Sequence, residues 1–237
     1  HPEGKFSSWL PKEKLTPENE KLKYSYARAL IEIKEYDEAL EIINYLHKKT
    51  KNEDTLYIVR NLLARVYKEQ NRIEDTIKEY SSLAKGKESQ EKVLAYCEII
   101  KIGLELSDKD LIKKYYEKCK SIVSEFVEST LETFDIFYIL AKGAKELGKI
   151  KETKAYYMEA LVVGRVLKNL EKERVAIIGE LFEVLDKSDF YSVQSIEVEY
   201  LELLKTTKDY QGALKILDYY RKYLPNELPQ KFDLFLK

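Results

Sequence analysis

Apolar residues recur along most of the chain with the spacing of amphipathic helices. Between residues 171 and 186 the apolar positions are Val175, Ile178, Leu181, Phe182 and Leu185, which form one stripe along a helix. Patterns of this kind predict eleven helices, over residues 18–34, 36–49, 54–69, 72–85, 89–106, 108–126, 130–147, 150–168, 171–186, 189–207 and 209–224.

Residues that break helices are confined to the ends of the chain. All five prolines lie before residue 18 or after residue 224, and only 8 of the 237 residues are glycine. A β-rich chain of this length needs many more turn residues. We therefore expect an all-α fold in one domain over residues 17–225. We expect residues 1–16 to be an irregular lead or linker, and residues 226–237 to be a tail that forms either a capping helix or the start of a further repeat.

The helices fall into repeated helix–turn–helix pairs. The second helix of each pair carries a recurring packing residue, usually small, and the intervals between its copies are 37, 36, 41 and 60 residues (Ala39, Thr76, Ile112, Thr153 and Ala213). A period of this size predicts a solenoid, because one unit cannot bury its apolar face alone. The last interval contains the predicted helix 171–186, which is either a half repeat or a slip in helix parity.

The repeated pattern resembles the tetratricopeptide repeat (TPR) family over roughly residues 18–225. The segment Lys34-Glu35-Tyr36-Asp37-Glu38-Ala39-Leu40 is similar to the family's turn motif, with Glu35 in place of the usual glycine, whereas the fourth copy keeps Gly148. In the third copy Ile112 replaces a small residue and Gly103 replaces an aromatic one. The resemblance implies a right-handed α-solenoid of about five hairpins with one irregular extra helix, whose first helices line a concave face.

Three columns of polar residues follow the first helices. The basic column is flanked by an acidic one and by a partly aromatic one (Arg28, Arg65, Lys101 and Lys142; Glu32, Glu69, Glu105 and Glu146; Tyr24, Asn61, Cys97 and Tyr138). On a concave face these residues would form a groove, in which arginine binds carboxylates and asparagine binds a peptide backbone. We expect the partner-binding residues to be Tyr24, Arg28, Asn61, Arg65, Lys101, Tyr138 and Lys142. The alternative is that the two charged columns form ordinary i,i+4 surface pairs.

Little in the sequence suggests catalysis. His47 lies among lysines, and Cys97 and Cys119 are too far apart for a metal site. No glycine-rich phosphate loop or nucleophile motif occurs. We expect no enzymatic activity, no cofactor and no metal. The cysteines are expected to be core thiols in a reducing compartment, which favours the cytoplasm, with a disulfide or redox switch as the alternative.

Charge and length limit the partners. With 41 basic and 42 acidic residues, the chain has no strong attraction for nucleic acid or anionic membranes. No apolar run is long enough to span a bilayer. The expected partner is a protein or an extended peptide segment, with homo-oligomers through the end repeats as a further possibility. The main function expected is a non-catalytic binding scaffold.

The alternative function is a sensory or regulatory segment of a longer signalling or transcription-regulating chain. The chain opens with His1 rather than Met, so we expect its native start to lie upstream. A signal, a lipid anchor or a catalytic domain could precede it.

Overall fold

The computed structural model describes residues 16–86, 89–125, 128–208 and 210–226. These residues contain eleven α-helices and one 3₁₀ turn, and no strand. The helices are α1 Pro17–Glu32, α2 Tyr36–Lys49, α3 Glu53–Glu69, α4 Ile73–Leu83, α5 Ser89–Leu106, α6 Lys109–Val123, α7 Leu131–Glu146, α8 Ile150–Val166, α9 Glu171–Phe182, η2 Lys187–Asp189, α10 Phe190–Thr207 and α11 Tyr210–Tyr223. The predicted all-α fold is confirmed, and each helix is found where the sequence pattern predicts it.

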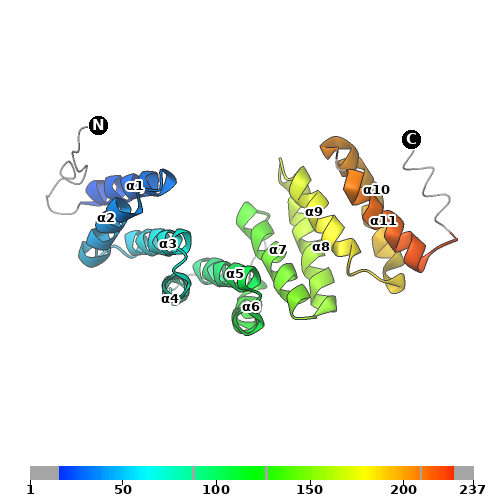
Figure 1. The fold of residues 1–237 in the computed structure, drawn as a ribbon, viewed down its shortest axis with the longest axis horizontal. Helices are drawn as coiled ribbons and strands as arrows, with labels where there is room; N and C mark the ends of the chain where they lie inside the picture. Colours follow the sequence, from blue (N-terminus) through cyan, green and yellow to red (C-terminus); the bar gives the residue numbers. More distant parts are fainter. Residues whose placement is uncertain (1–15, 87–88, 126–127, 209, 227–237) are drawn as a thin grey trace. The chain divides into compact units, whose positions relative to one another are not determined.

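The chain divides into two compact units, residues 1–102 and 103–237, with the division inside α5. In the first unit α1 contacts α2 and α3, and α3 contacts α4 (Figure 1). In the second unit α7, α8 and α9 lie side by side, and α9 also contacts α10 and α11. Neighbouring helices therefore pack together within each unit.

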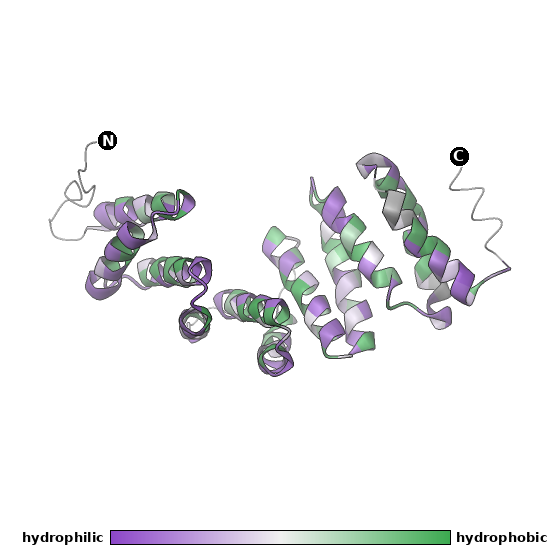
Figure 2. Ribbon diagram, viewed as in Figure 1, coloured by the Kyte–Doolittle hydropathy of each residue, from purple (hydrophilic) through white to green (hydrophobic). Residues whose placement is uncertain are grey.

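Each unit has its own apolar core. The core of the first unit includes Ala27, Leu46 and Leu63, and that of the second includes Tyr157 and Ile178. Every helix mixes hydrophobic and hydrophilic residues along its length (Figure 2), as expected for helices that bury only one face. Within the described residues, no helix is long and apolar enough to cross a membrane.

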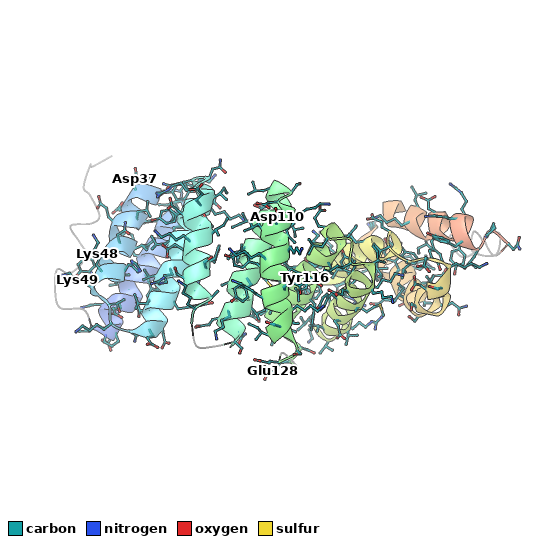
Figure 3. The ribbon with its side chains drawn as sticks, turned by 90° about the horizontal axis from the view of Figure 1, so that it is seen from below. Asp37, Lys48, Lys49, Asp110, Tyr116 and Glu128 are labelled. Atoms are coloured by element: carbon teal, nitrogen blue, oxygen red, sulfur yellow. The ribbon has the colours of Figure 1, made fainter. Side chains whose placement is uncertain are left out.

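Side-chain caps and charged ends account for several helix boundaries. Thr16, Asn52, Asp108 and Thr130 each accept the backbone N–H three residues later, at 3.3, 3.0, 2.9 and 3.1 Å. These bonds satisfy N–H groups that have no partner within the helix. Helix α2 has no side-chain cap, but Asp37 lies in its first turn and Lys48 and Lys49 in its last (Figure 3). That order complements the helix dipole.

Four hairpins share one turn geometry. The turn residue adopts a left-handed conformation in each, with φ of 65°, 57°, 55° and 70° at Lys34, Asn71, Ser107 and Gly148. The next residue donates its N–H to the carbonyl five positions earlier, at 2.8–2.9 Å (Glu35 to Leu30, Arg72 to Tyr67, Asp108 to Gly103, Lys149 to Ala144). These four turns recur at the first three intervals seen in the sequence, 37, 36 and 41 residues.

The third hairpin departs from the repeat by exchanging two side-chain sizes. A Cβ placed on Gly103 would lie 2.8 Å from Cγ1 of Ile112. Ile112 is fully buried at the position that Ala39 and Thr76 occupy in the first two hairpins. The missing side chain at Gly103 therefore makes room for the larger one at Ile112, so the two departures compensate each other.

The predicted extra helix is not an isolated insertion. Helix α9 contacts both α10 and α11, as α1 contacts both α2 and α3. A Cβ on Gly179 or Gly212 would lie 3.0 or 2.6 Å from the hydroxyl of Tyr200, so α9 and α11 approach this α10 residue closely. The bend between α9 and α10 is anchored on α8, where Lys154 Nζ lies 3.1 Å from Asp186 and 2.6 Å from Asp189.

Predictions for the chain ends and for Ala213 are left open. The expected lead over residues 1–16 falls outside the described residues except for Thr16, and the expected tail over 226–237 does so except for Asn226. The side chain of Ala213 also lies outside them.

Candidate functional site

The seven residues expected to bind a partner are shared between the two units. Tyr24 and Arg28 lie on α1, Asn61 and Arg65 on α3, and Lys101 on α5, all within the first unit. Tyr138 and Lys142 lie on α7 in the second unit.

Three of the predicted residues line one open hollow in the first unit. Arg28, Asn61 and Arg65 come together there, in a space of about 480 Å³, which is within the range typical of small-ligand sites. We call it the α1–α3 hollow. Its other lining residues are Glu32, Leu62, Lys68, Glu69, Tyr80 and Glu98. Tyr24 is not among them, since it packs partly buried against the core of this unit.

The charges of the hollow are mostly paired, but not in the i,i+4 manner considered from the sequence. Arg65 reaches across from α3 to Glu32 on α1, at 2.9 Å. Lys101 binds Glu98, three residues earlier, at 2.6 Å. Arg28 is exposed and has no hydrogen-bond or ion-pair partner among the described residues. Arg28 is therefore the cation of this hollow that is left to bind a ligand.

Tyr80 was not predicted as a site residue. It comes from α4 and is only 7% exposed, yet it lines the hollow. Its hydroxyl has no hydrogen-bond partner within the described part of the chain. Burial raises the pKa of Tyr80 well above that of free tyrosine, and the charge of Glu98 raises it further. The hydroxyl is thus a neutral donor at neutral pH.

A signal for Tyr80 exists in the sequence. Tyr116 and Tyr157 stand at the same position of the third and fourth hairpins, and both hydroxyls donate to glutamates. Figure 3 labels Tyr116, whose partner is Glu152 on α8. Helical spacing alone does not distinguish a ring in the core from a hydroxyl at its edge, so the sequence pattern did not mark these three tyrosines as site residues.

In the second unit the predicted residues are already occupied by the chain itself. The hydroxyl of Tyr138 donates to Glu180 of α9 at 2.9 Å, and Tyr157 donates to the other oxygen of the same carboxylate. Lys142 Nζ lies 3.9 Å from Glu180 and 4.7 Å from the centre of the Tyr138 ring. The predicted partner-binding residues Tyr138 and Lys142 are thus already engaged by Glu180.

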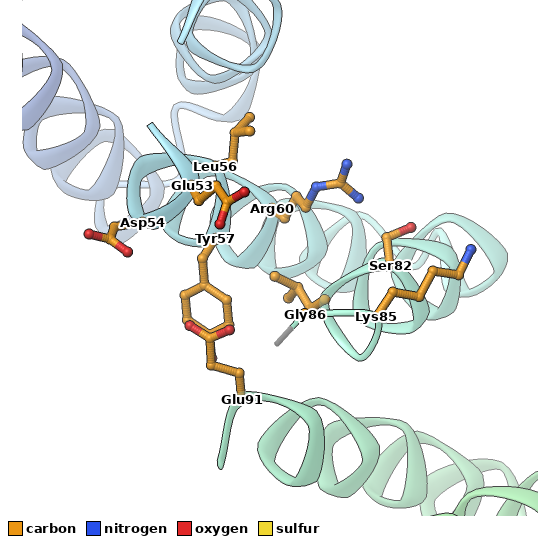
Figure 4. A pocket seen from close by; sticks show the side chains of 10 residues that line it. Glu53, Asp54, Leu56, Tyr57, Arg60, Ser82, Lys85, Gly86 and Glu91 are labelled. Atoms are coloured by element: carbon orange, nitrogen blue, oxygen red, sulfur yellow. The ribbon is translucent and has the colours of Figure 1, made fainter. Parts of the chain in front are cut away.

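A second hollow, of about 350 Å³, lies in the first unit between α3, α4 and the start of α5 (Figure 4). It was not predicted from the sequence. Its lining mixes carboxylates and cations around one partly buried aromatic ring (Glu53, Asp54, Leu56, Tyr57, Arg60, Ser82, Leu83, Lys85, Gly86 and Glu91). Burial raises the pKa of Tyr57. None of the seven predicted residues lines this hollow.

The structure bears on metal binding and on the two cysteines. Among the described residues, no group of three or more His, Cys, Asp or Glu side chains could hold a metal ion. Cys97 and Cys119 are not joined in a disulfide, and their exposed fractions are 3% and 0%. The prediction that both are buried core thiols is confirmed.

The chain was also compared with known proteins. No model of a known protein family matches it, and no curated protein matches it.

Proposed function

We propose that this protein is a non-catalytic scaffold that binds a protein or peptide segment through the exposed face of its first helices. We further propose that its hairpins stack as a right-handed solenoid of the TPR kind. The four equivalent turns and the contacts between neighbouring helices support that arrangement.

One observation carries the proposal: the α1–α3 hollow contains a cation without a partner beside paired charges. Arg28 is exposed and has no ion-pair partner among the described residues, whereas Arg65 and Lys101 already hold Glu32 and Glu98. A guanidinium offers five N–H donors in a fixed fork. It suits a ligand that supplies acceptor oxygens.

The rest of the hollow suits a peptide better than a purely charged ligand. It contains both signs of charge, the amide of Asn61, the hydroxyl of Tyr80 and the apolar Leu62. An extended peptide presents carbonyl oxygens, N–H groups and side chains together. A polyanion would meet the carboxylates of Glu69 and Glu98.

Selection from a library of displayed random peptides tests the proposal. We expect the selection to yield peptides that bind the wild-type protein. Their binding to the variant Arg28→Glu should be at least about tenfold weaker than to wild type, because repulsion replaces a charge-assisted hydrogen bond. Lys78→Glu makes the same charge change on the exposed part of α4, outside the hollow, and serves as the matched control. Peptides that bind wild type and Arg28→Glu equally well would contradict the proposal.

A further inference from the structure

The second and fourth hairpins carry equivalent sets of polar side chains. Relative to Thr76 and Thr153, the tyrosine four residues later is Tyr80 or Tyr157. At the two matching positions of the first helix stand Asn61 and Arg65, or Tyr138 and Lys142. Each hairpin therefore presents a phenol, a further hydrogen-bond donor and a cation in the same register.

In the fourth hairpin this set surrounds a carboxylate. Both oxygens of Glu180 accept tyrosine hydroxyls, from Tyr138 and Tyr157, while Lys142 lies close by. Two donors and a nearby cation are what an ionised carboxyl group requires when it leaves water. In the fourth hairpin, this set of side chains therefore binds a glutamate carboxylate.

In the second hairpin, no carboxylate of the described residues is bound in that way. Glu98 comes from the following helix, as Glu180 does, but it pairs with Lys101. Arg65 pairs with Glu32. Tyr80 lines the α1–α3 hollow, and its hydroxyl has no hydrogen-bond partner among the described residues. Arg28, on the same hollow, also lacks a partner there.

We propose that the α1–α3 hollow binds the side-chain carboxylate of a glutamate in the partner peptide, with the hydroxyl of Tyr80 and the guanidinium of Arg28 as its donors. This inference rests on the proposed function and specifies its ligand. Because Tyr80 is held by burial, its hydroxyl loses little freedom on binding, which favours affinity. Asn61 lines the same hollow. Its amide nitrogen donates to the Tyr57 carbonyl at 3.2 Å, and its amide oxygen suits an N–H of the peptide backbone.

The same hollow limits the ligand to an isolated acidic residue. Glu69 and Glu98 also line it, and a second acidic side chain next to the first would approach their charges. Like charges brought together raise the free energy of a complex. We therefore expect peptides with one glutamate among neutral residues to bind better than acidic runs.

NMR titration with three small probes tests the site directly. The probes are N-acetyl-glutamate methylamide, its glutamine counterpart, and N-acetyl-glycine, which offers a terminal carboxylate. We expect the glutamate probe to shift the Tyr80 ring and Arg28 Nε resonances, and the other two to shift them much less. Equal shifts with the glutamine probe, or stronger ones with the terminal carboxylate, would overturn the inference.

A pair of tyrosine variants separates binding from folding. Tyr80→Phe removes a hydroxyl that has no hydrogen-bond partner among the described residues. It should lower the affinity for the glutamate probe about tenfold and leave the melting temperature of the protein unchanged. Tyr157→Phe removes the bond to Glu180, so it should lower the melting temperature and leave probe binding unchanged. Probe binding that is equal in wild type and Tyr80→Phe would contradict the proposed role of Tyr80.

Library peptides distinguish this inference from the proposed function. If peptides bind through Arg28 but show neither a preference for glutamate nor any dependence on Tyr80, the scaffold function stands and the inference fails. If the glutamate probe binds through Tyr80 but no library peptide is captured, the carboxylate site stands and the scaffold function fails.

Discussion

Within the hairpins, the two positions represented by Gly103 and Ile112 differ in size from copy to copy. The corresponding pairs are Leu30 with Ala39, Tyr67 with Thr76 and Ala144 with Thr153. Only the third copy has its large residue on the second helix and none on the first. Packed interiors respond to changes of a single methylene group, so such an exchange requires both residues to change together.

Replacing this pair with that of the first hairpin is the sharpest test. Gly103→Leu alone should cost about 1–3 kcal/mol of unfolding free energy through overpacking. Ile112→Ala alone should cost about 2–5 kcal/mol through the cavity it leaves. The double variant should be more stable than either single variant in urea unfolding. A double variant whose loss equals the sum of the two would show that these residues do not share one space.

Both thiols should be protected from reagents in the native protein. Cys97 and Cys119 are buried, and a thiol reacts as its exposed thiolate. We expect labelling with a chromogenic disulfide to be far slower in buffer than in denaturant. Equal rates in the two conditions would contradict the buried placement.

The shared turn is the feature of the helical elements with the clearest energetic consequence. Three of its four left-handed positions are filled by Lys34, Asn71 and Ser107 rather than by glycine. The left-handed conformation costs most L-residues about 1–2 kcal/mol, and it costs glycine little. Asparagine tolerates this conformation better than most residues. The turns of Lys34 and Ser107 therefore retain strain that the turn of Gly148 avoids.

Opposite substitutions in two of these turns should have opposite effects. Gly148→Ala should destabilise the protein by about 1 kcal/mol, although no atom lies within 4 Å of the new Cβ. Ser107→Gly should stabilise it, by a smaller amount because glycine also gains freedom in the unfolded chain. Urea midpoints measure both changes. A destabilised Ser107→Gly would mean that its side chain, rather than its backbone, supports the turn.

The helices themselves could be predicted from the sequence because their causes are local. Apolar spacing and caps such as that of Thr16 act over one or two turns, and every predicted helix is present in the described residues. The packing of α9 against other helices could not be predicted, because its contacts with α10 and α11 join residues far apart in the chain. Close approaches such as that of Gly212 to Tyr200 leave no periodic pattern.

At the scale of the whole molecule, charge pairs connect helices that are distant in sequence. In the second unit Glu183, which directly follows α9, lies 2.7 Å from Lys145 of α7 and 2.6 Å from Lys215 of α11. Glu199 of α10 binds both Arg165 and Arg174. Burial by itself would raise the pKa of Glu199, but the hydrogen bonds from these arginines more than offset it and lower the pKa.

Acid should therefore destabilise the second unit. Hydrogen bonds from the Tyr116 hydroxyl and then from Lys120 lower the pKa of Glu152, and those from Ser188 lower the pKa of Asp186 to about 2. A carboxyl group whose pKa is lower in the folded state stabilises that state above its unfolded pKa, about 4.3 for glutamate. The stabilisation is lost as the pH falls through the lower, folded value.

The variant Glu199→Gln tests this dependence. It should lower the urea midpoint at neutral pH and make the midpoint fall less steeply below about pH 4.3. Glu159→Gln, at an exposed residue of α8 with no ion-pair partner among those described, is the matched control and should leave the profile unchanged. Identical acid profiles for wild type and Glu199→Gln would contradict the assignment.

The candidate site was predictable only in part, because some of its contacts join residues far apart in the chain. Three residues of the predicted columns, Arg28, Asn61 and Arg65, line one hollow. The columns did not show which cation remains without a partner, because Arg65 is paired across two helices. We accordingly expect Arg28→Ala to weaken peptide capture more than the double replacement of Arg65 and Lys101 by alanine, as measured by binding of one selected peptide to each variant.

The size exchange between Gly103 and Ile112 also restricts how such a chain can change by duplication and recombination. A crossover within a hairpin would join the first helix of one copy to the second helix of another. A first helix carrying Tyr67 would then meet Ile112, while one carrying Gly103 would face Thr76 and leave a void. Crossovers in the connections between hairpins preserve every matched pair, so the segment that can be copied or transplanted intact is the complete hairpin.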